Sequence, residues 1–149
     1  MTATKEQLQA LLERVEAATG PDREIDGELD AALRMGTSSL PDWARNNFPR
    51  WKHINSGRVC CLHDDGSHGL NWASAEFTAS IDSALALVER VLADREIDLH
   101  INKPRRDWQA ACIRITPLVM LCGECATLPL AILAALLKAL IAQSDEVAA

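Results

Sequence analysis

Residues 126–141 read Ala126-Thr127-Leu128-Pro129-Leu130-Ala131-Ile132-Leu133-Ala134-Ala135-Leu136-Leu137-Lys138-Ala139-Leu140-Ile141, and they decide the fold of this chain. Leu and Ala dominate this stretch, and both are strong helix formers. Thr127 can cap the helix, and Pro129 fits its first turn, where a missing N–H costs little. Because a helix that is apolar on nearly every side must be covered all round, the other elements are expected to pack around it.

Such a helix is either a buried core helix or a membrane span. A span needs about 20 apolar residues, and here the apolar run is interrupted by Pro117 and Glu124 upstream and by Lys138 downstream. We therefore expect a core helix and no membrane association. Its surplus apolar surface also predicts a homo-oligomer, in which a second copy covers part of it.

The segments before this helix carry one apolar face each. Helical spacing of apolar residues predicts helices that begin after Thr4, Asp22 and Ser80, each of which can cap a helix. The second helix also carries acidic residues, which we interpret as a solvated face: Asp22, Glu24, Asp26, Glu28 and Asp30.

Two strands are expected between the third helix and the C-terminal one. Residues 97–101 alternate apolar and polar side chains, and residues 108–115 place Ala111, Ile113 and Ile115 on one face. Lys103–Asp107 would form the turn between them. A further short hairpin is predicted from 51–54 and 58–62. The order helix, strand, strand, helix over 78–142 predicts an α+β fold. Specifically, we expect a three-layer α/β/α sandwich whose small antiparallel sheet is covered by the N-terminal helices and the buried C-terminal helix.

The length of 149 residues favours a single domain, 1–149. Within it we distinguish two helices (1–35), an irregular insert containing Cys, His and Trp residues (36–75), the helix-strand-strand-helix unit (76–143) and a tail (144–149). A hydrophobic fraction of 48% and a charged fraction of 24% are ordinary for a globular protein. The net charge of −6 argues against general nucleic-acid binding, which depends on neutralising phosphates.

The N-terminal residues lack a basic start followed by an apolar core, so no signal peptide and a cytoplasmic location are expected. The chain has five cysteines. An odd number in a cytoplasmic protein favours free thiols or a metal site over a disulfide framework.

Three blocks in order resemble small proteobacterial phage and prophage proteins of the phage ABA sandwich family. They are LLERVEAATGPDREID (11–26), FTASIDSALALV (77–88) and ATLPLA (126–131). The resemblance implies an α/β/α fold, a phage origin and a location in the cytoplasm of the bacterial host. It implies no general activity, because the three blocks are capping and packing signatures. The insert 36–75 departs from the family's usual middle, so a specialised function is expected there.

Two cysteines at CxxC spacing, Cys122 and Cys125, form the sharpest local motif. Thiolates two residues apart can bind one zinc ion, and Cys60 and His63 could complete four ligands. No cofactor is otherwise expected. The alternative interpretation is small buried thiols, since free cysteine is among the most buried residue types.

A Cys/His hydrolase is a further alternative, with Cys61 as the nucleophile and His63 or His68 as its base. The sequence contains no phosphate-binding glycine loop, no HExxH and no GxSxG motif. We therefore expect a protein without enzymatic activity.

A compact cationic turn offers a candidate ligand site. Lys103, Arg105 and Arg106 could contact an anion or phosphate, with Arg58 and Trp72 converging on the same ligand. The sequence thus predicts a phage accessory protein that counters or modulates a bacterial defence system. Its partner would be a host immune protein or a nucleotide-derived messenger, and a zinc-stabilised structural module is the main alternative.

Overall fold

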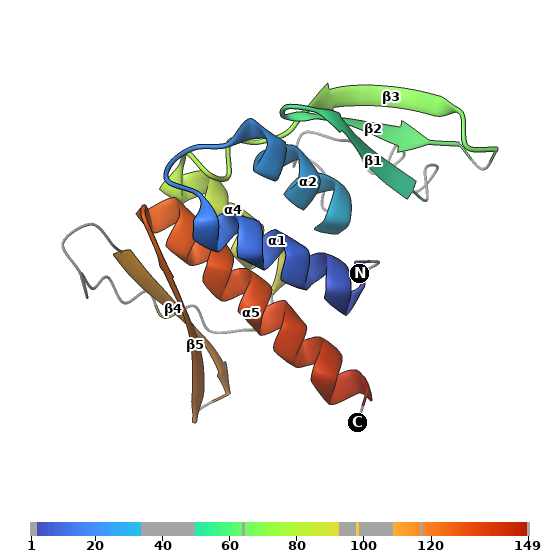
Figure 1. The fold of residues 1–149 in the computed structure, drawn as a ribbon. Helices are drawn as coiled ribbons and strands as arrows, with labels where there is room; N and C mark the ends of the chain where they lie inside the picture. The colour runs from blue at the N-terminus through green and yellow to red at the C-terminus, as the bar shows by residue number, and fades with distance from the viewer. Residues whose placement is uncertain are drawn as a thin grey trace.

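The structure is a computed structural model of the 149-residue chain, and it describes residues 3–33, 50–63, 65–92, 98, 109–116 and 118–148. Within these ranges lie helices and strands in the order α1 (Lys5–Ala17), α2 (Arg23–Leu33), β1 (Arg50–Asn55), β2 (Arg58–Leu62), β3 (His68–Ala73), α4 (Ile81–Val91), β4 (Gln109–Thr116), β5 (Val119–Cys125) and α5 (Leu128–Ala148). The helices lie between two antiparallel sheets, β1-β2-β3 and β4-β5 (Figure 1). The predicted α+β class is confirmed.

Helix α5 is the core helix that the sequence predicts. From Leu130 to Leu137 every residue is at most 2% exposed, and Thr127 caps the helix by accepting from the Leu130 N–H. Its window Leu128–Asp145 is long and apolar enough to cross a membrane, but 61% of that window is buried inside the protein. The surrounding cover comes from α1, α4, β4 and β5 of the same chain. The homo-oligomer stays a prediction.

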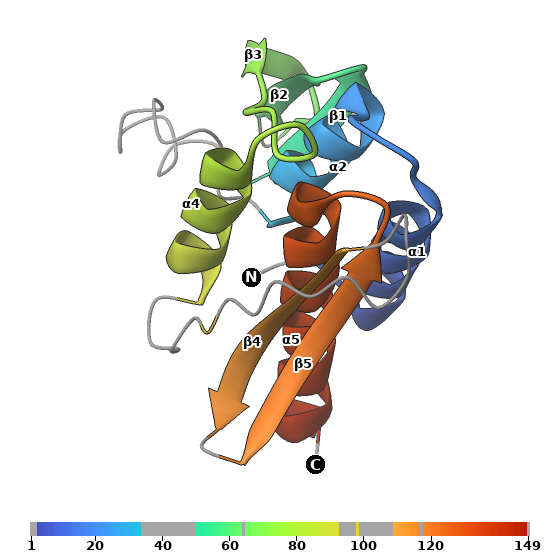
Figure 2. The ribbon, with the colours of Figure 1, turned by 90° about the vertical axis from the view of Figure 1, so that its left-hand side faces the viewer.

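The two-stranded sheet lies across α5, with α1 and α4 on either side (Figure 2). Strand β4 matches the predicted strand 108–115, whereas β5 was not predicted. The strand 97–101, which was expected to pair with 108–115, lies outside the described residues apart from Asp98. The turn Lys103–Asp107 lies outside them as well. Gly123 of β5 lets the strand approach the helix closely, since a Cβ atom there would lie 2.2 Å from the Ala131 carbonyl oxygen.

The three-stranded sheet packs on α2. Strands β1 and β2 confirm the hairpin predicted around Ser56 and Gly57, and β3 adds a third strand. Ser56 adopts a left-handed conformation with φ of 45°. This turn approaches the first half of α2, where the side chains of Glu24, Glu28 and His53 meet.

Candidate binding site at α1, α2 and the β1–β2 turn

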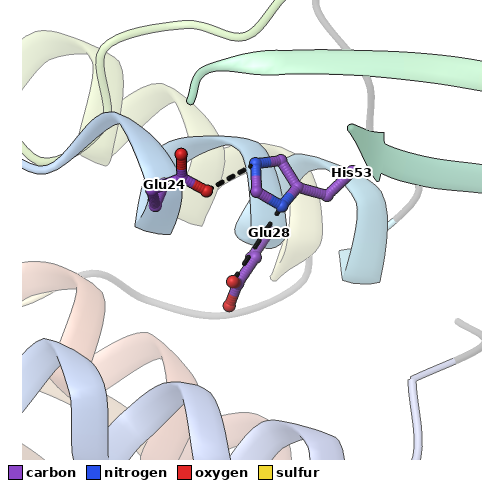
Figure 3. Close-up of side chains that lie close together, drawn as sticks. All are labelled: Glu24, Glu28 and His53. Atoms are coloured by element: carbon purple, nitrogen blue, oxygen red, sulfur yellow. Dashed lines mark ion pairs between the residues drawn. The ribbon is translucent and has the colours of Figure 1, made fainter. Parts of the chain in front are cut away.

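His53 of β1 lies over α2 between two carboxylates (Figure 3). Its Nε2 atom is 3.2 Å from a Glu24 oxygen, and its Nδ1 atom is 3.9 Å from a Glu28 oxygen. The two glutamates are four residues apart, so the helix presents them on one face. Nε2 also lies 2.6 Å from the Ser56 carbonyl oxygen. Because a carbonyl oxygen only accepts hydrogen bonds, Nε2 carries a proton.

Gly27 allows the histidine ring to rest on the helix. A Cβ atom at this position would lie 2.4 Å from His53 Cδ2 and 2.7 Å from the Ser56 carbonyl oxygen. Glycine weakens a helix interior by about 0.5–1 kcal/mol relative to alanine. Close approach of the β1–β2 turn explains why glycine occupies the middle of α2.

Each carboxylate has a second partner besides the ring. The Ser56 backbone N–H donates to Glu24 Oε1, and Arg14 of α1 donates to Glu28 Oε2. His53 is 17% exposed, and Glu28 is 33% exposed. Three segments thus converge at this point: α1 through Arg14, α2 through the glutamates, and the hairpin through His53 and Ser56.

A groove of about 380 Å³ begins at these side chains and runs between α1 and α2. Ligand pockets in proteins commonly measure about 300–1,000 Å³. Short apolar side chains leave the space open, and charged groups gather around Glu28. The lining residues are Ala3, Gln7, Ala10, Leu11, Arg14, Glu28, Ala31, Ala32 and His53. The groove can therefore hold apolar groups next to a polar end.

Two aspartates of α2 are buried, contrary to the expectation of a solvated acidic face. Asp26 accepts from the Thr78 N–H and the Arg23 guanidinium at 2.8 and 2.9 Å. Burial nevertheless raises its pKa, against the lowering effect of the Thr78 and Arg23 hydrogen bonds. The difference arises because the three-stranded sheet packs on α2, a tertiary contact that the pattern of the helix sequence does not indicate.

Asp30 is the more perturbed of the two. It is 1% exposed, and burial raises its pKa to about 6. Trp72, Ser74 and Arg90 act in the opposite direction. Neither carboxylate oxygen makes a hydrogen bond of ordinary geometry within the described part of the chain. Desolvation therefore determines the protonation of Asp30 more than the nearby donors do.

Two of the five residues predicted to bind an anion, Arg58 and Trp72, lie on opposite faces of the three-stranded sheet. Val59 pairs with Trp72 across β2 and β3, so both point to the same face of the sheet. Arg58 precedes Val59 and points to the opposite face, where it donates to the Asn71 side chain at 2.6 Å. The structure thus separates Arg58 from Trp72. Lys103, Arg105 and Arg106 lie outside the described residues.

The predicted zinc ligands are also dispersed. Cys122 forms a disulfide with Cys112, its cross-strand neighbour, and Cys125 points toward the core on the other face of β5. Cys60 lies in β2 and His63 directly follows that strand, and Figure 1 shows this three-stranded sheet at the opposite end of the molecule. The expectation of free thiols holds for Cys60, Cys61 and Cys125 but is wrong for the disulfide pair, because strand pairing brings two cysteines together that are ten residues apart in the sequence.

Cys61 has an environment that disfavours a nucleophile. It is completely buried, its thiol donates to the Leu70 carbonyl oxygen at 3.2 Å, and burial raises its pKa. Nucleophilic cysteines need the thiolate form, which this environment opposes. Burial also raises the pKa of Cys125 to about 12.

Sequence reasoning did not single out His53, Gly27 or Arg14. The one usable signal was Gly27 within a helical pattern, since a glycine there often marks close approach of another segment. Comparisons of the chain with models of protein families, with curated proteins and with solved structures found no match.

Proposed function

We propose that this protein acts by binding, as a phage accessory protein that counters or modulates a bacterial defence system. The α1–α2 groove is its binding surface. The groove itself carries the binding part of this proposal, because it combines an apolar floor with the polar end formed by Arg14, Glu28 and His53. The phage context rests on the three sequence blocks that resemble the phage ABA sandwich family. The defence role rests on the absence of catalytic motifs from the sequence, since small phage proteins of this kind often act by binding a host protein or a signal.

A protein partner suits the groove better than a nucleotide-derived messenger. Phosphate groups are bound most strongly by arginines that are free to form bidentate hydrogen bonds. Arg14 is the arginine among the lining residues that the structure describes, and it is already paired with Glu28. Alanines and Leu11 offer contacts to apolar side chains instead. We therefore favour a host immune protein that inserts an apolar side chain between α1 and α2.

A matched pair of substitutions tests the groove. Ala10 lines it from α1, and its side chain is exposed, so Ala10→Arg fills the space without disturbing the core. Ala86 is exposed on α4 and does not line the groove, so Ala86→Arg is the control. Proteins recovered with each variant from bacterial extracts are quantified against the wild type. A partner should be recovered with the wild type and the control and be lost with Ala10→Arg, while thermal unfolding stays the same.

Equal recovery of the same proteins with all three forms would contradict the groove as the binding surface. A small molecule of a few hundred daltons that is lost with Ala10→Arg would keep the groove and replace the host protein with the messenger.

A further inference from the structure

We propose that His53, Glu24 and Glu28 form a binding site for a divalent transition-metal ion of the Zn²⁺ type. One ligand atom from each residue can be chosen so that all three lie within 4.8 Å of one another (Figure 3). Imidazole together with carboxylates is a donor set that zinc uses, whereas calcium and magnesium prefer oxygen ligands alone. The ligands come from two segments, β1 and α2, so a bound ion would link the hairpin to the helix.

The hydrogen bond of His53 prepares its other nitrogen for a metal. Nε2 donates to the Ser56 carbonyl oxygen, so in the neutral imidazole Nδ1 carries the lone pair. A backbone carbonyl that accepts from the second ring nitrogen is the usual way in which a metal-binding histidine is oriented. Nδ1 faces Glu28 Oε1 across 3.9 Å. Two ligands of a tetrahedral zinc lie about 3.4 Å apart when the bonds are about 2.1 Å long, so a small movement brings Nδ1 and Glu28 Oε1 to that spacing.

The local charges favour a cation. Glu24 and Glu28 contribute two negative charges, and Arg14 offsets one of them through Glu28 Oε2, which leaves Oε1 directed at His53. Glu24 directs Oε2 at the ring while its Oε1 accepts from the Ser56 N–H. The hydrogen bonds therefore leave Glu28 Oε1 directed at Nδ1. Glu24 Oε2 faces the protonated Nε2, so Glu24 reaches the ion by turning from Nε2 toward Nδ1.

Glu28 and His53 also line the α1–α2 groove. A four-coordinate ion with three protein ligands keeps one position for water or another donor. The site depends on these residues and not on the proposed partner, so metal binding can be tested without one.

The test uses the untagged full-length protein after treatment with a chelator, titrated with ZnCl₂ in a calorimeter. We expect one ion per chain. His53→Gln and Glu28→Gln should each weaken binding at least about tenfold. His68→Gln is the matched control, because His68 is an exposed histidine of the same sheet, and it should bind like the wild type. Absence of binding by the wild type, or unchanged binding by both site variants, would overturn the proposal.

Two further measurements show whether the variants are folded and which side chains bind the metal. Circular dichroism shows whether the site variants are folded, and Glu28→Gln serves if His53→Gln is not. The absorption spectrum with Co²⁺ identifies the donors. A spectrum without a thiolate-to-cobalt charge-transfer band supports the histidine and carboxylates, whereas a strong thiolate band would move the ion to the free cysteines and overturn the site.

Discussion

The two sheets of this protein pack against helices with opposite chemistry. Strands β4 and β5 contact α5 through small and apolar residues, and Gly123 brings strand and helix backbones together. The β1–β2 hairpin contacts α2 through His53, Glu24 and Glu28, with Gly27 allowing the close approach. Both contacts depend on one glycine, but the first buries hydrocarbon and the second gathers charge.

This difference assigns stability to the apolar contact with α5 and binding to the polar contact with α2. Burial of apolar surface contributes roughly 25 cal/mol per Å², so the α5 contact is expected to supply much of the folding free energy. Partly exposed ion pairs contribute about 0–1 kcal/mol each, and buried charges oppose folding unless they are well paired. The polar contact is therefore expected to serve recognition more than stability, and four measurements examine this contrast.

The largest loss in the free energy of unfolding is expected from Gly123→Ala. The added methyl group would meet the Ala131 carbonyl oxygen, the Ala134 side chain and the backbone of α5, none of which can move easily. Overpacking costs about 1–3 kcal/mol and occasionally more, and we expect a loss of at least about 3 kcal/mol in urea unfolding. Gly20→Ala is the control, because no atom lies near a Cβ there. Equal stability of both variants would show that the sheet does not pack tightly on α5.

Asp30 should make the polar side of α2 sensitive to pH. Its pKa of about 6 in the folded protein exceeds its ordinary value of 3.8. Between these values the folded state holds a proton that the unfolded state has lost, so the free energy of unfolding decreases as pH rises from about 4 to 6. The decrease should reach up to about 3 kcal/mol. Asp26, whose pKa is also raised, contributes in the same direction.

Asp30→Asn should remove most of this decrease and stabilise the protein at pH 7.5 but not at pH 4. Asp82→Asn, on the exposed first turn of α4, should keep the wild-type profile. Chemical unfolding at a series of pH values measures both. A profile of Asp30→Asn that parallels the wild type would assign the pH dependence to other groups.

Reduction of the Cys112–Cys122 disulfide should lower the free energy of unfolding by an amount similar to, or slightly smaller than, the decrease caused by Asp30. The bond closes a loop of sequence separation 10, for which the chain-entropy estimate is roughly 2–3 kcal/mol. A reducing agent should lower the thermal midpoint of the wild type and have no effect on the Cys112→Ser/Cys122→Ser double variant. In a cytoplasm, the location predicted from the sequence, such bonds are usually reduced. An identical midpoint with and without reductant would show that the hairpin needs no covalent link.

The smallest effect is expected at the surface. Lys5 and Asp145 form an ion pair at 2.6 Å, but their side chains are 43% and 57% exposed. Lys5→Ala should cost about 0.5 kcal/mol or less, and added salt should remove even that. A loss above about 1 kcal/mol in urea unfolding would mean that exposed charges stabilise this fold more than the comparison of the two sheets suggests.

The sequence predicted the elements whose pattern is local. Leu130–Leu137 is apolar on all sides, and Thr4 and Ser80 have the spacing of helix caps, so α5, α1 and α4 were found correctly. Strand β5 was not predicted, because the spacing of Cys122 and Cys125 indicates a metal motif and gives no strand pattern. Strand pairing then decided the chemistry of Cys122, and pairing is not visible in a periodic pattern.

The candidate site could not be predicted because it is made by tertiary contacts. Glu24 and Glu28 looked like part of a solvated face, and His53 had no partner within its own strand. Only the fold brings Arg14, the two glutamates and His53 together, across 39 residues of sequence from first to last. The division of the chain into segments, the phage family, the partner and the cytoplasmic location stay predictions.

Native mass spectrometry of the protein purified from bacterial cells tests the central claim, that the α1–α2 groove binds the partner. The wild type and Ala86→Arg should carry the same additional mass of a host protein, and Ala10→Arg should appear without it. The same additional mass on Ala10→Arg, or the bare chain for all three proteins, would contradict the claim.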